Sequence, residues 1–238
     1  MQEVLSLYDE EGNVIEEKEF VERAKELYKT ATTDDGRGIN AEMLKVTTNS
    51  DTQINSAAAY ETFNFLDRRF YINGEIDHEV ALHIHEFISY WNEIDTSEDV
   101  IPLIIFINSP GGDLDATFSI IDSIQSSNIP VYTINIGRAW SGAFLVLLAG
   151  EKRYGTLYSS YLFHEGSCGY SQDAHKIIQY TDFYQQMLKH MKSFILARTS
   201  ITIAQYDEHQ KDDWWLNSSD AIKYSIIDNL YTKGVEIE

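Results

Sequence analysis

Residues 101–125 read IPLIIFINSPGGDLDATFSIIDSIQ, an apolar run followed at once by a two-glycine turn and an amphipathic segment. The run is rich in isoleucine and does not alternate with polar residues, which is typical of a strand buried on both faces. After the turn, Phe118, Ile121 and Ile124 recur at helical spacing. The stretch therefore predicts a buried strand, a glycine turn and a helix that packs back on the strand, which is the building unit of an α/β fold.

The same alternation continues on both sides of this unit. Strands are expected at 68–74, 129–137, 152–166 (one or two) and 226–231, and helices after Asp77, from GRAWSG to about Gly150, and over 171–199. Short loops follow the strands, which favours parallel pairing with right-handed crossovers. In such sheets, sites lie beyond the carboxyl ends of the strands. Three motifs fall there: SPGG at 109–112, GRAWSG at 137–142 and HEGSCG at 164–169.

The first 59 residues follow a different pattern. A glycine turn in DEEG at 9–12 predicts a small hairpin, the segment 16–29 has a helical apolar stripe, and residues 30–59 are polar and rich in turn formers. We therefore expect an N-terminal extension over 1–59, made of a hairpin, a helix and a flexible connection, and one large domain over 60–238.

Composition limits the partners. The chain has 38 acidic and 18 basic residues, a net charge of −20, which repels nucleic acid and anionic membrane surfaces. The single cysteine, Cys168, allows neither an intramolecular disulfide nor a thiolate cluster, and the apolar runs are too short to span a bilayer. His78 and His83 are five residues apart and do not form a metal-binding HExxH helix. We expect a cytoplasmic protein without a metal.

Ser141 has two interpretations. A serine at the start of a helix is most often an N-cap. It is a nucleophile if its hydroxyl is activated, and Gly142 would then let a substrate approach and keep its N–H free at a helix N-terminus. The residue types alone leave both interpretations open.

The other motifs also have two interpretations. The SPGG glycines form either a tight turn or an oxyanion hole, which needs exposed N–H groups. His164 is either a polar residue at a strand end or a general base. Asp212 and Asp213 either cap a loop or orient a histidine. Trp215, two residues beyond Asp213, would lie on the same side of an extended segment and shield that carboxylate from water.

Together these motifs resemble the proteolytic subunits of the Clp protease, the ClpP family of serine peptidases. INSPGG at 107–112 matches the family's strand-and-loop motif, and GRAWS at 137–141 is similar to its GxAAS. YLFHEG at 161–166 carries a histidine in the family's position, and DDWWLNSSDAIKYSIID at 212–228 is similar to RDxFxxxxEAxxYGLID. The resemblance covers about residues 68–231 and implies a ClpP/crotonase-like α/β fold, a spiral of β-β-α units with a long handle helix.

The resemblance implies a serine endopeptidase that needs no cofactor. Ser141 would be the nucleophile, His164 the general base and Asp213 the carboxylate that orients the histidine. The N–H groups of Gly112 and Gly142 would form the oxyanion hole, although the family has methionine at the position of Gly142.

The resemblance also implies an assembly. The family forms heptameric rings that enclose the active sites, and an AAA+ unfoldase that consumes ATP feeds them unfolded polypeptides. Asp212 stands where the family has an arginine that links two rings, so we expect a single ring or a salt-sensitive double ring. The family's unfoldase docks on an apolar surface, and the residues near the matching strands are Ile104, Phe106, Ile134 and Ile136, which would otherwise be plain core.

Three alternatives stay open from the sequence. A ClpP-type phage head-maturation protease would use the same chemistry without an unfoldase. A non-catalytic ring subunit would not need the Ser–His–Asp set. A crotonase-type acyl-CoA enzyme shares the spiral fold and a backbone oxyanion hole, but it also has no need for that set.

Overall fold

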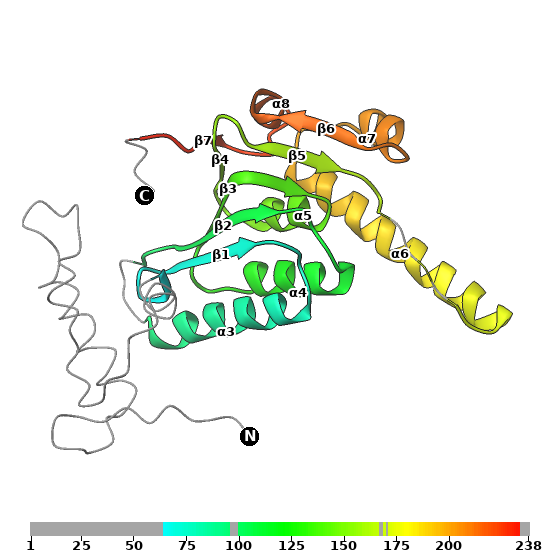
Figure 1. The fold of residues 1–238 in the computed structure, drawn as a ribbon, viewed down its shortest axis with the longest axis horizontal. Helices are drawn as coiled ribbons and strands as arrows, with labels where there is room; N and C mark the ends of the chain where they lie inside the picture. Colours follow the sequence, from blue (N-terminus) through cyan, green and yellow to red (C-terminus); the bar gives the residue numbers. More distant parts are fainter. Residues whose placement is uncertain (1–63, 96–99, 167–168, 170, 234–238) are drawn as a thin grey trace, which may run out of the picture. The chain divides into compact units, whose positions relative to one another are not determined.

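The computed structural model describes residues 64–95, 100–166, 169 and 171–233. The chain divides into two compact units, Met1–Leu66 and Asp67–Glu238, and nearly all described residues belong to the second (Figure 1). The hairpin, helix and connection predicted within residues 1–59 lie outside the described residues, so the boundary expected at residue 60 stays a prediction.

The second unit confirms the predicted α/β class. Its elements are β1 (Arg69–Asn73), α3 (His78–Ile94), β2 (Leu103–Ser109), α4 (Leu114–Gln125), β3 (Val131–Trp140), α5 (Gly142–Ala149), β4 (Arg153–Gly155), β5 (Ser160–Phe163), α6 (Ala174–Arg198), α7 (Ile203–His209), β6 (Trp214–Asn217), α8 (Ser218–Lys223) and β7 (Asn229–Leu230). The strand order is β1-β2-β3-β4-β7, all parallel, with β5 parallel to the end of β3. The long predicted helix is α6.

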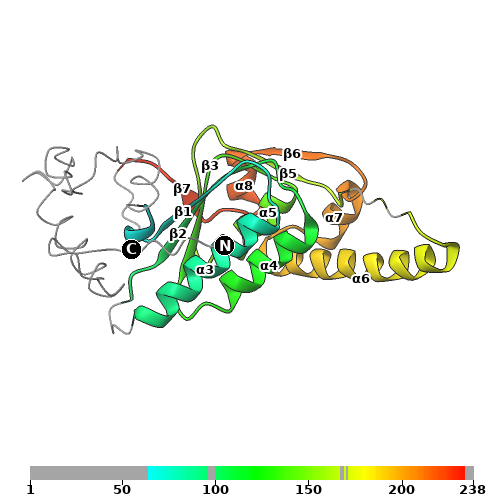
Figure 2. The ribbon, with the colours of Figure 1, turned by 60° about the horizontal axis from the view of Figure 1, so that its bottom comes forward.

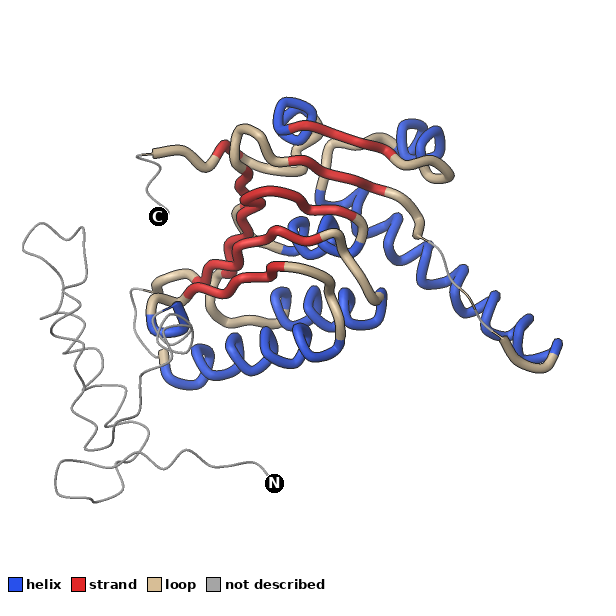
Figure 3. The backbone as a smooth tube through the Cα atoms, in the orientation of Figure 1, coloured by secondary structure: helices blue, strands red, loops and turns tan. Residues whose placement is uncertain are grey.

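Helices α3 and α4 lie along one face of this sheet (Figures 2 and 3). Asp77 caps α3 as predicted, because its carboxylate accepts a hydrogen bond from the Val80 N–H at 2.9 Å. The strand β2 supplies Leu103, Ile105 and Ile107 to the core, all fully buried. In α4 the inward stripe is Ala116, Thr117, Ile120, Ile121 and Ile124. Phe118, predicted to point inward, is only partly buried because it lies beside this stripe.

The strand β3 is longer than the sequence predicted. It was expected to end at Gly137, but it continues to Trp140 because its last residues, from Arg138 on, pair with β5. Strand β3 pairs with β4 as far as Asn135 and with β5 from Arg138, and the Asn135 side chain spans this change. Its amide donates to the Ser160 carbonyl, and its oxygen accepts from the Gly137 N–H. Ser141 therefore follows a strand directly, with no intervening turn.

A further strand, β6, runs antiparallel to β5 at the edge of the sheet. The sequence left this segment open as extended chain or turn. Leu216 faces inward and is buried, whereas Trp215 and Asn217 are exposed on the other face. This edge strand brings residue 213 alongside the end of β5.

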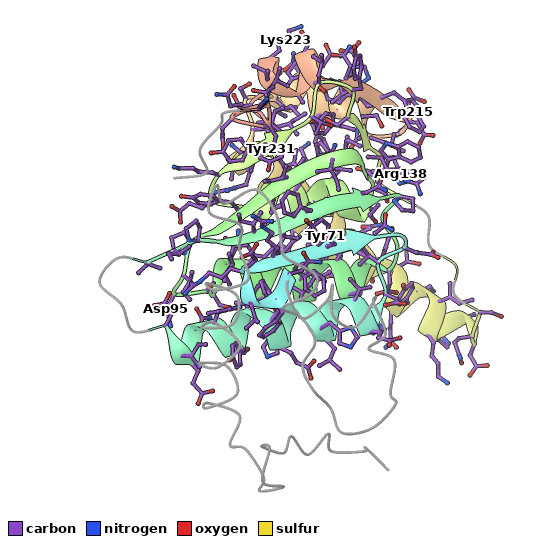
Figure 4. The ribbon with its side chains drawn as sticks, turned by 60° about the vertical axis from the view of Figure 1, so that its left-hand side comes forward. Tyr71, Asp95, Arg138, Trp215, Lys223 and Tyr231 are labelled. Atoms are coloured by element: carbon purple, nitrogen blue, oxygen red, sulfur yellow. The ribbon has the colours of Figure 1, made fainter. Side chains whose placement is uncertain are left out.

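An aromatic cluster covers the sheet face opposite α3 and α4. Its members are Tyr71, Ile104, Phe106, Tyr132, Ile134, Tyr154 and Tyr231; Figure 4 labels the tyrosines at its two ends. Tyr71 stacks on Phe106 with ring centroids 4.7 Å apart. Of the four residues considered for docking, Phe106 and Ile134 are buried in this cluster, Ile104 is partly buried, and Ile136 is 40% exposed.

In the part of the chain that the structure describes, no helix combines the length and the apolar character needed to cross a bilayer. The same residues contain no group of three or more histidine, cysteine, aspartate or glutamate side chains that could hold a metal ion.

Candidate active site

Ser141 joins β3 to α5, and its side chain does not cap the helix. Its Oγ instead lies 2.7 Å from Nε2 of His164, within hydrogen-bonding distance. The structure therefore favours the second of the two interpretations of this serine, in which the hydroxyl is paired with a base.

The backbone of Ser141 is strained and firmly held. Its φ of 53° and ψ of −121° lie in a region that residues with a side chain rarely adopt, at a cost of about 1–3 kcal/mol. The Ser141 N–H donates to the Leu162 carbonyl at 2.9 Å, and the Ser141 carbonyl accepts from Phe144 at 3.0 Å. Every residue of α5 is buried, so the helix that follows is fixed in the core.

Gly111 and Gly112 bring the backbone against this serine. Gly111 has a φ of 90°, and a Cβ there would lie 2.7 Å from the Gly142 nitrogen and 2.8 Å from Cβ of Ser141. At Gly112 a Cβ would lie 2.1 Å from the Ile76 carbonyl oxygen. Only glycine fits either position.

The backbone N–H groups of Gly112 and Gly142 are the two that the sequence suggested for an oxyanion hole. Gly112 forms a parallel bridge with Ile76 that uses the Gly111 carbonyl and the Asp113 N–H, so the N–H of Gly112 itself is directed away from Ile76. Gly142 is the first residue of α5, where the N–H has no partner within the helix. Within the described residues no hydrogen bond engages either N–H.

His164 and Asp213 complete the array. His164 follows β5, and its Nδ1 lies 3.4 Å from Oδ1 of Asp213, which immediately precedes β6. This distance is longer than the ~2.8 Å of a tight charge-assisted hydrogen bond. The Asp213 side chain is 57% exposed, whereas that of His164 is 32% exposed. Asp212, the alternative carboxylate, is exposed at the surface and has no ion pair with His164 among the described residues.

The proposed shield over Asp213 is wrong. Trp215 packs against Trp140, with ring centroids 5.1 Å apart and planes at 86°, and leaves the Asp213 carboxylate largely in water. Asp213 precedes β6, the strand at the edge of the sheet, where neighbouring side chains cover it poorly.

Two residues that contact the site, Ile76 and Thr117, could not be predicted from motifs in the sequence. Ile76 fixes the glycine loop through its backbone, and a backbone contact leaves no trace in residue type. Thr117 on α4 lies so close to Gly142 that a Cβ there would be 2.4 Å from the threonine Oγ1. The sequence shows glycine at position 142, where the family has methionine. It does not show that Thr117, on another helix, packs against this glycine.

Ser141, His164 and Asp213 come together in that order, beside the N–H groups of Gly112 and Gly142 and beyond the carboxyl ends of the parallel strands. Serine hydrolases use these residue types in this order. The sequence model of the Clp protease family matches residues 21–234. The chain belongs to the Clp protease family.

Named relatives agree with this family. The ATP-dependent Clp protease proteolytic subunit 2 of Treponema pallidum is 30% identical over 172 residues, which cover 71% of this chain and 85% of the relative. The protein of the same name from Borreliella burgdorferi is 30% identical over 173 residues, covering 72% and 86%. The ATP-dependent Clp protease proteolytic subunit of Porphyromonas gingivalis is 26% identical over 205 residues, covering 84% and 90%. The family and these names support a peptidase.

Proposed function

We propose that the protein is a serine endopeptidase that hydrolyses unfolded polypeptides, with Ser141, His164 and Asp213 as its catalytic residues. The observation that carries this proposal is the 2.7 Å contact between Ser141 Oγ and His164 Nε2, made by a serine whose backbone is strained and whose hydroxyl caps nothing. A serine that only packs or caps a helix would need neither the contact with His164 nor the strained backbone.

The chemistry is acyl transfer through the serine. His164 takes the Ser141 proton at Nε2 as the hydroxyl oxygen attacks the substrate carbonyl, and Asp213 stabilises the resulting imidazolium at Nδ1. The N–H groups of Gly112 and Gly142 donate to the oxyanion that forms. His164 then protonates the leaving amine, and a water molecule releases the acyl group by the reverse sequence of proton transfers. These steps need no metal or organic cofactor.

We also propose that the subunits assemble into a ring of identical chains. Helix α6 buries only Met191 and Ile195, yet it exposes Ile177, Ile178 and Phe183, the second of these by 59%. Apolar residues on one long exposed helix mark an interaction surface. A heptamer follows the family resemblance, and Asp212 in place of arginine favours a single ring or a salt-sensitive double ring.

The partner of this ring would be an ATP-dependent AAA+ unfoldase in the cytoplasm. The names of the relatives, "ATP-dependent Clp protease proteolytic subunit", support such a partner. Ile136, exposed beside the aromatic cluster, is the residue of the predicted docking set that remains accessible to it.

Covalent labelling tests the catalytic proposal. A fluorophosphonate probe should modify the full chain at one site, and digestion with mass spectrometry should map the adduct to Ser141. The Ser141→Ala variant should not react, and wild-type protein should hydrolyse quenched fluorogenic peptides. An unlabelled Ser141 together with no peptide hydrolysis would overturn the proposal. Native mass spectrometry of the same sample tests the assembly, which a monomer at micromolar concentration would rule out.

A further inference from the structure

Two tryptophans stand side by side on the sheet face that carries the catalytic array. Trp140 is paired with Leu162 across the β3–β5 ladder, and Leu162 is paired with Trp215 across the β5–β6 ladder. Cross-strand partners share a face, so the two indoles flank one leucine. Leu162 is only 7% exposed although it lies on the open side of the sheet, because the indoles cover it.

This face leads directly to the reacting groups. His164 is two residues beyond Leu162, and Asp213 is two residues before Trp215, so each continues the same side of its strand. Trp140 is the residue immediately before the nucleophile. The alternate residues, such as Tyr161 and Phe163, point the other way into the core. The indole pair therefore forms the surface next to Ser141 rather than part of the interior.

The pair is rigid, and one of its rings is accessible. The Trp140 Nε1–H donates to Ser160 Oγ at 3.0 Å, which fixes the orientation of that ring. Trp215 meets it edge to face and remains 54% exposed. A tryptophan presents a large apolar area with few rotatable bonds, and for this reason it dominates peptide and protein recognition where it is exposed.

Arg138 adds a positive charge to the same surface. Its guanidinium lies over the Trp140 ring, 5.0 Å from the ring centroid, and Figure 4 shows Arg138 and Trp215 at the same edge of the sheet. No ion pair to Arg138 is found among the residues that the structure describes. A stacked guanidinium keeps its outer N–H groups available for a carboxylate.

We propose that Trp140, Trp215 and Arg138 form a substrate subsite that selects polypeptide segments in which an aromatic or large aliphatic side chain lies near an aspartate or glutamate. The inference rests on the proposed peptidase function and adds to it a substrate class. The occupant is the substrate chain because Trp140 directly precedes Ser141, so the surface adjoins the hydroxyl that a substrate carbonyl must reach. The apolar side chain packs on Trp215, and the acidic side chain pairs with Arg138.

The test is a cleavage profile of the full chain on a mixed library of synthetic peptides, with the cut bonds identified by mass spectrometry. Wild-type protein should cut most often where an aromatic or large aliphatic residue and an acidic residue lie close to the bond. For a matched pair of quenched peptides that differ only by glutamate or glutamine, Arg138→Gln should lower kcat/KM on the glutamate peptide by about tenfold, mainly through KM. Arg138→Glu should shift the profile toward lysine-containing segments.

Two control variants remove similar side chains at positions outside the proposed subsite. Lys223 lies over Tyr224 at 4.9 Å, a similar cation–aromatic pair far from Arg138 in Figure 4, so Lys223→Gln should leave the profile unchanged. Trp215→Ala should weaken the preference for large apolar residues, whereas Tyr158→Ala, which removes an aromatic side chain that is 93% exposed elsewhere, should not.

The outcomes separate the two proposals. If Ser141 is labelled and peptides are cut, but the profile is the same in wild type and Arg138→Glu, the subsite is wrong and the peptidase stands. If Trp215→Ala changes the oligomeric mass and leaves the profile intact, the pair is a contact between subunits and the subsite is again wrong. If wild-type protein is neither labelled nor active, the peptidase proposal fails and the subsite fails with it.

Discussion

The two ends of the Ser–His–Asp array are held very differently. Ser141 lies between a paired strand and a wholly buried helix, with its N–H bound to Leu162 and Gly111 packed against it. Asp213 precedes a four-residue edge strand, is 57% exposed and stands 3.4 Å from its histidine. The position of Ser141 is thus a property of the core, whereas the position of the Asp213 carboxylate depends on the sheet edge.

This difference implies a gradient of sensitivity. Substitutions at the serine end should act through chemistry or core packing and be severe. Substitutions at the carboxylate end should be graded, because an exposed ion pair is worth little by itself and water competes for it. Four predictions, each with its measurement, test and extend this comparison, from the largest expected effect on turnover to the smallest.

Ser141→Ala should abolish peptidase activity, with a loss of about 10⁴- to 10⁶-fold in kcat, because no other group can attack the carbonyl. Its helical content and oligomeric mass should match wild type, since the Ser141 side chain caps nothing. Hydrolysis of a quenched peptide, followed to long reaction times, provides the measurement. Turnover within tenfold of wild type would show that Ser141 is not the nucleophile.

Asp213→Asn should lower kcat by about 10²- to 10⁴-fold, because the amide can hold the wrong histidine tautomer. Asp212→Asn is the matched control: it removes one charge from the neighbouring, exposed position and should change kcat less than about twofold. Both variants must be compared at equal oligomeric mass. A greater loss for Asp212→Asn would reverse the assignment of the carboxylate.

Gly142→Ala should destabilise the fold by about 1–3 kcal/mol, because its Cβ meets Thr117 Oγ1 in a packed interior. The Thr117→Ala change in the same chain should recover most of this loss, since it removes the clashing hydroxyl. Urea unfolding of the two single variants and the double variant completes the cycle. Additive destabilisation in the double variant would mean that the two side chains do not meet.

Ile178→Ser combined with Phe183→Ser should change assembly and leave the chemistry of each subunit nearly intact. Both side chains are more than half exposed on α6, so the isolated subunit loses little core. Native mass spectrometry should show smaller species, and the fluorophosphonate should still react with Ser141. Unchanged oligomeric mass would indicate that these two side chains do not form the contact between subunits.

The sequence predicted the parts of the fold that depend on local pattern. The strand–turn–helix unit at 103–125, the Asp77 cap and the long helix all follow from spacing and capping residues. It missed what depends on distant partners. GRAWSG contains two glycines and suggests a turn, yet residues 138–140 stay extended because a strand some 20 residues later pairs with them.

The candidate site shows the same division. The residue types at 141, 164 and 213 came from motifs, and the structure brings their side chains together. The packing of Thr117 against Gly142 and the pairing of Trp215 with Trp140 did not come from motifs. Both are contacts between elements far apart in the chain, and a single sequence does not encode them as a pattern.

The anchoring of α6 has a mechanical consequence. Its Arg198 side chain donates to the carbonyls of Leu148 and Gly150, and Arg153 donates to the Arg198 carbonyl, so the last turn is fastened at the end of α5, the helix that follows Ser141. The 25-residue helix is therefore a lever with its pivot at the end of α5. Over the roughly 25 Å from Met191 to Ala174, a tilt of about 10° displaces the tip by about 4 Å. Partway along the lever, the Tyr184 hydroxyl donates to the Glu165 carbonyl at 3.3 Å, so this hydrogen bond links the helix to the residue next to His164.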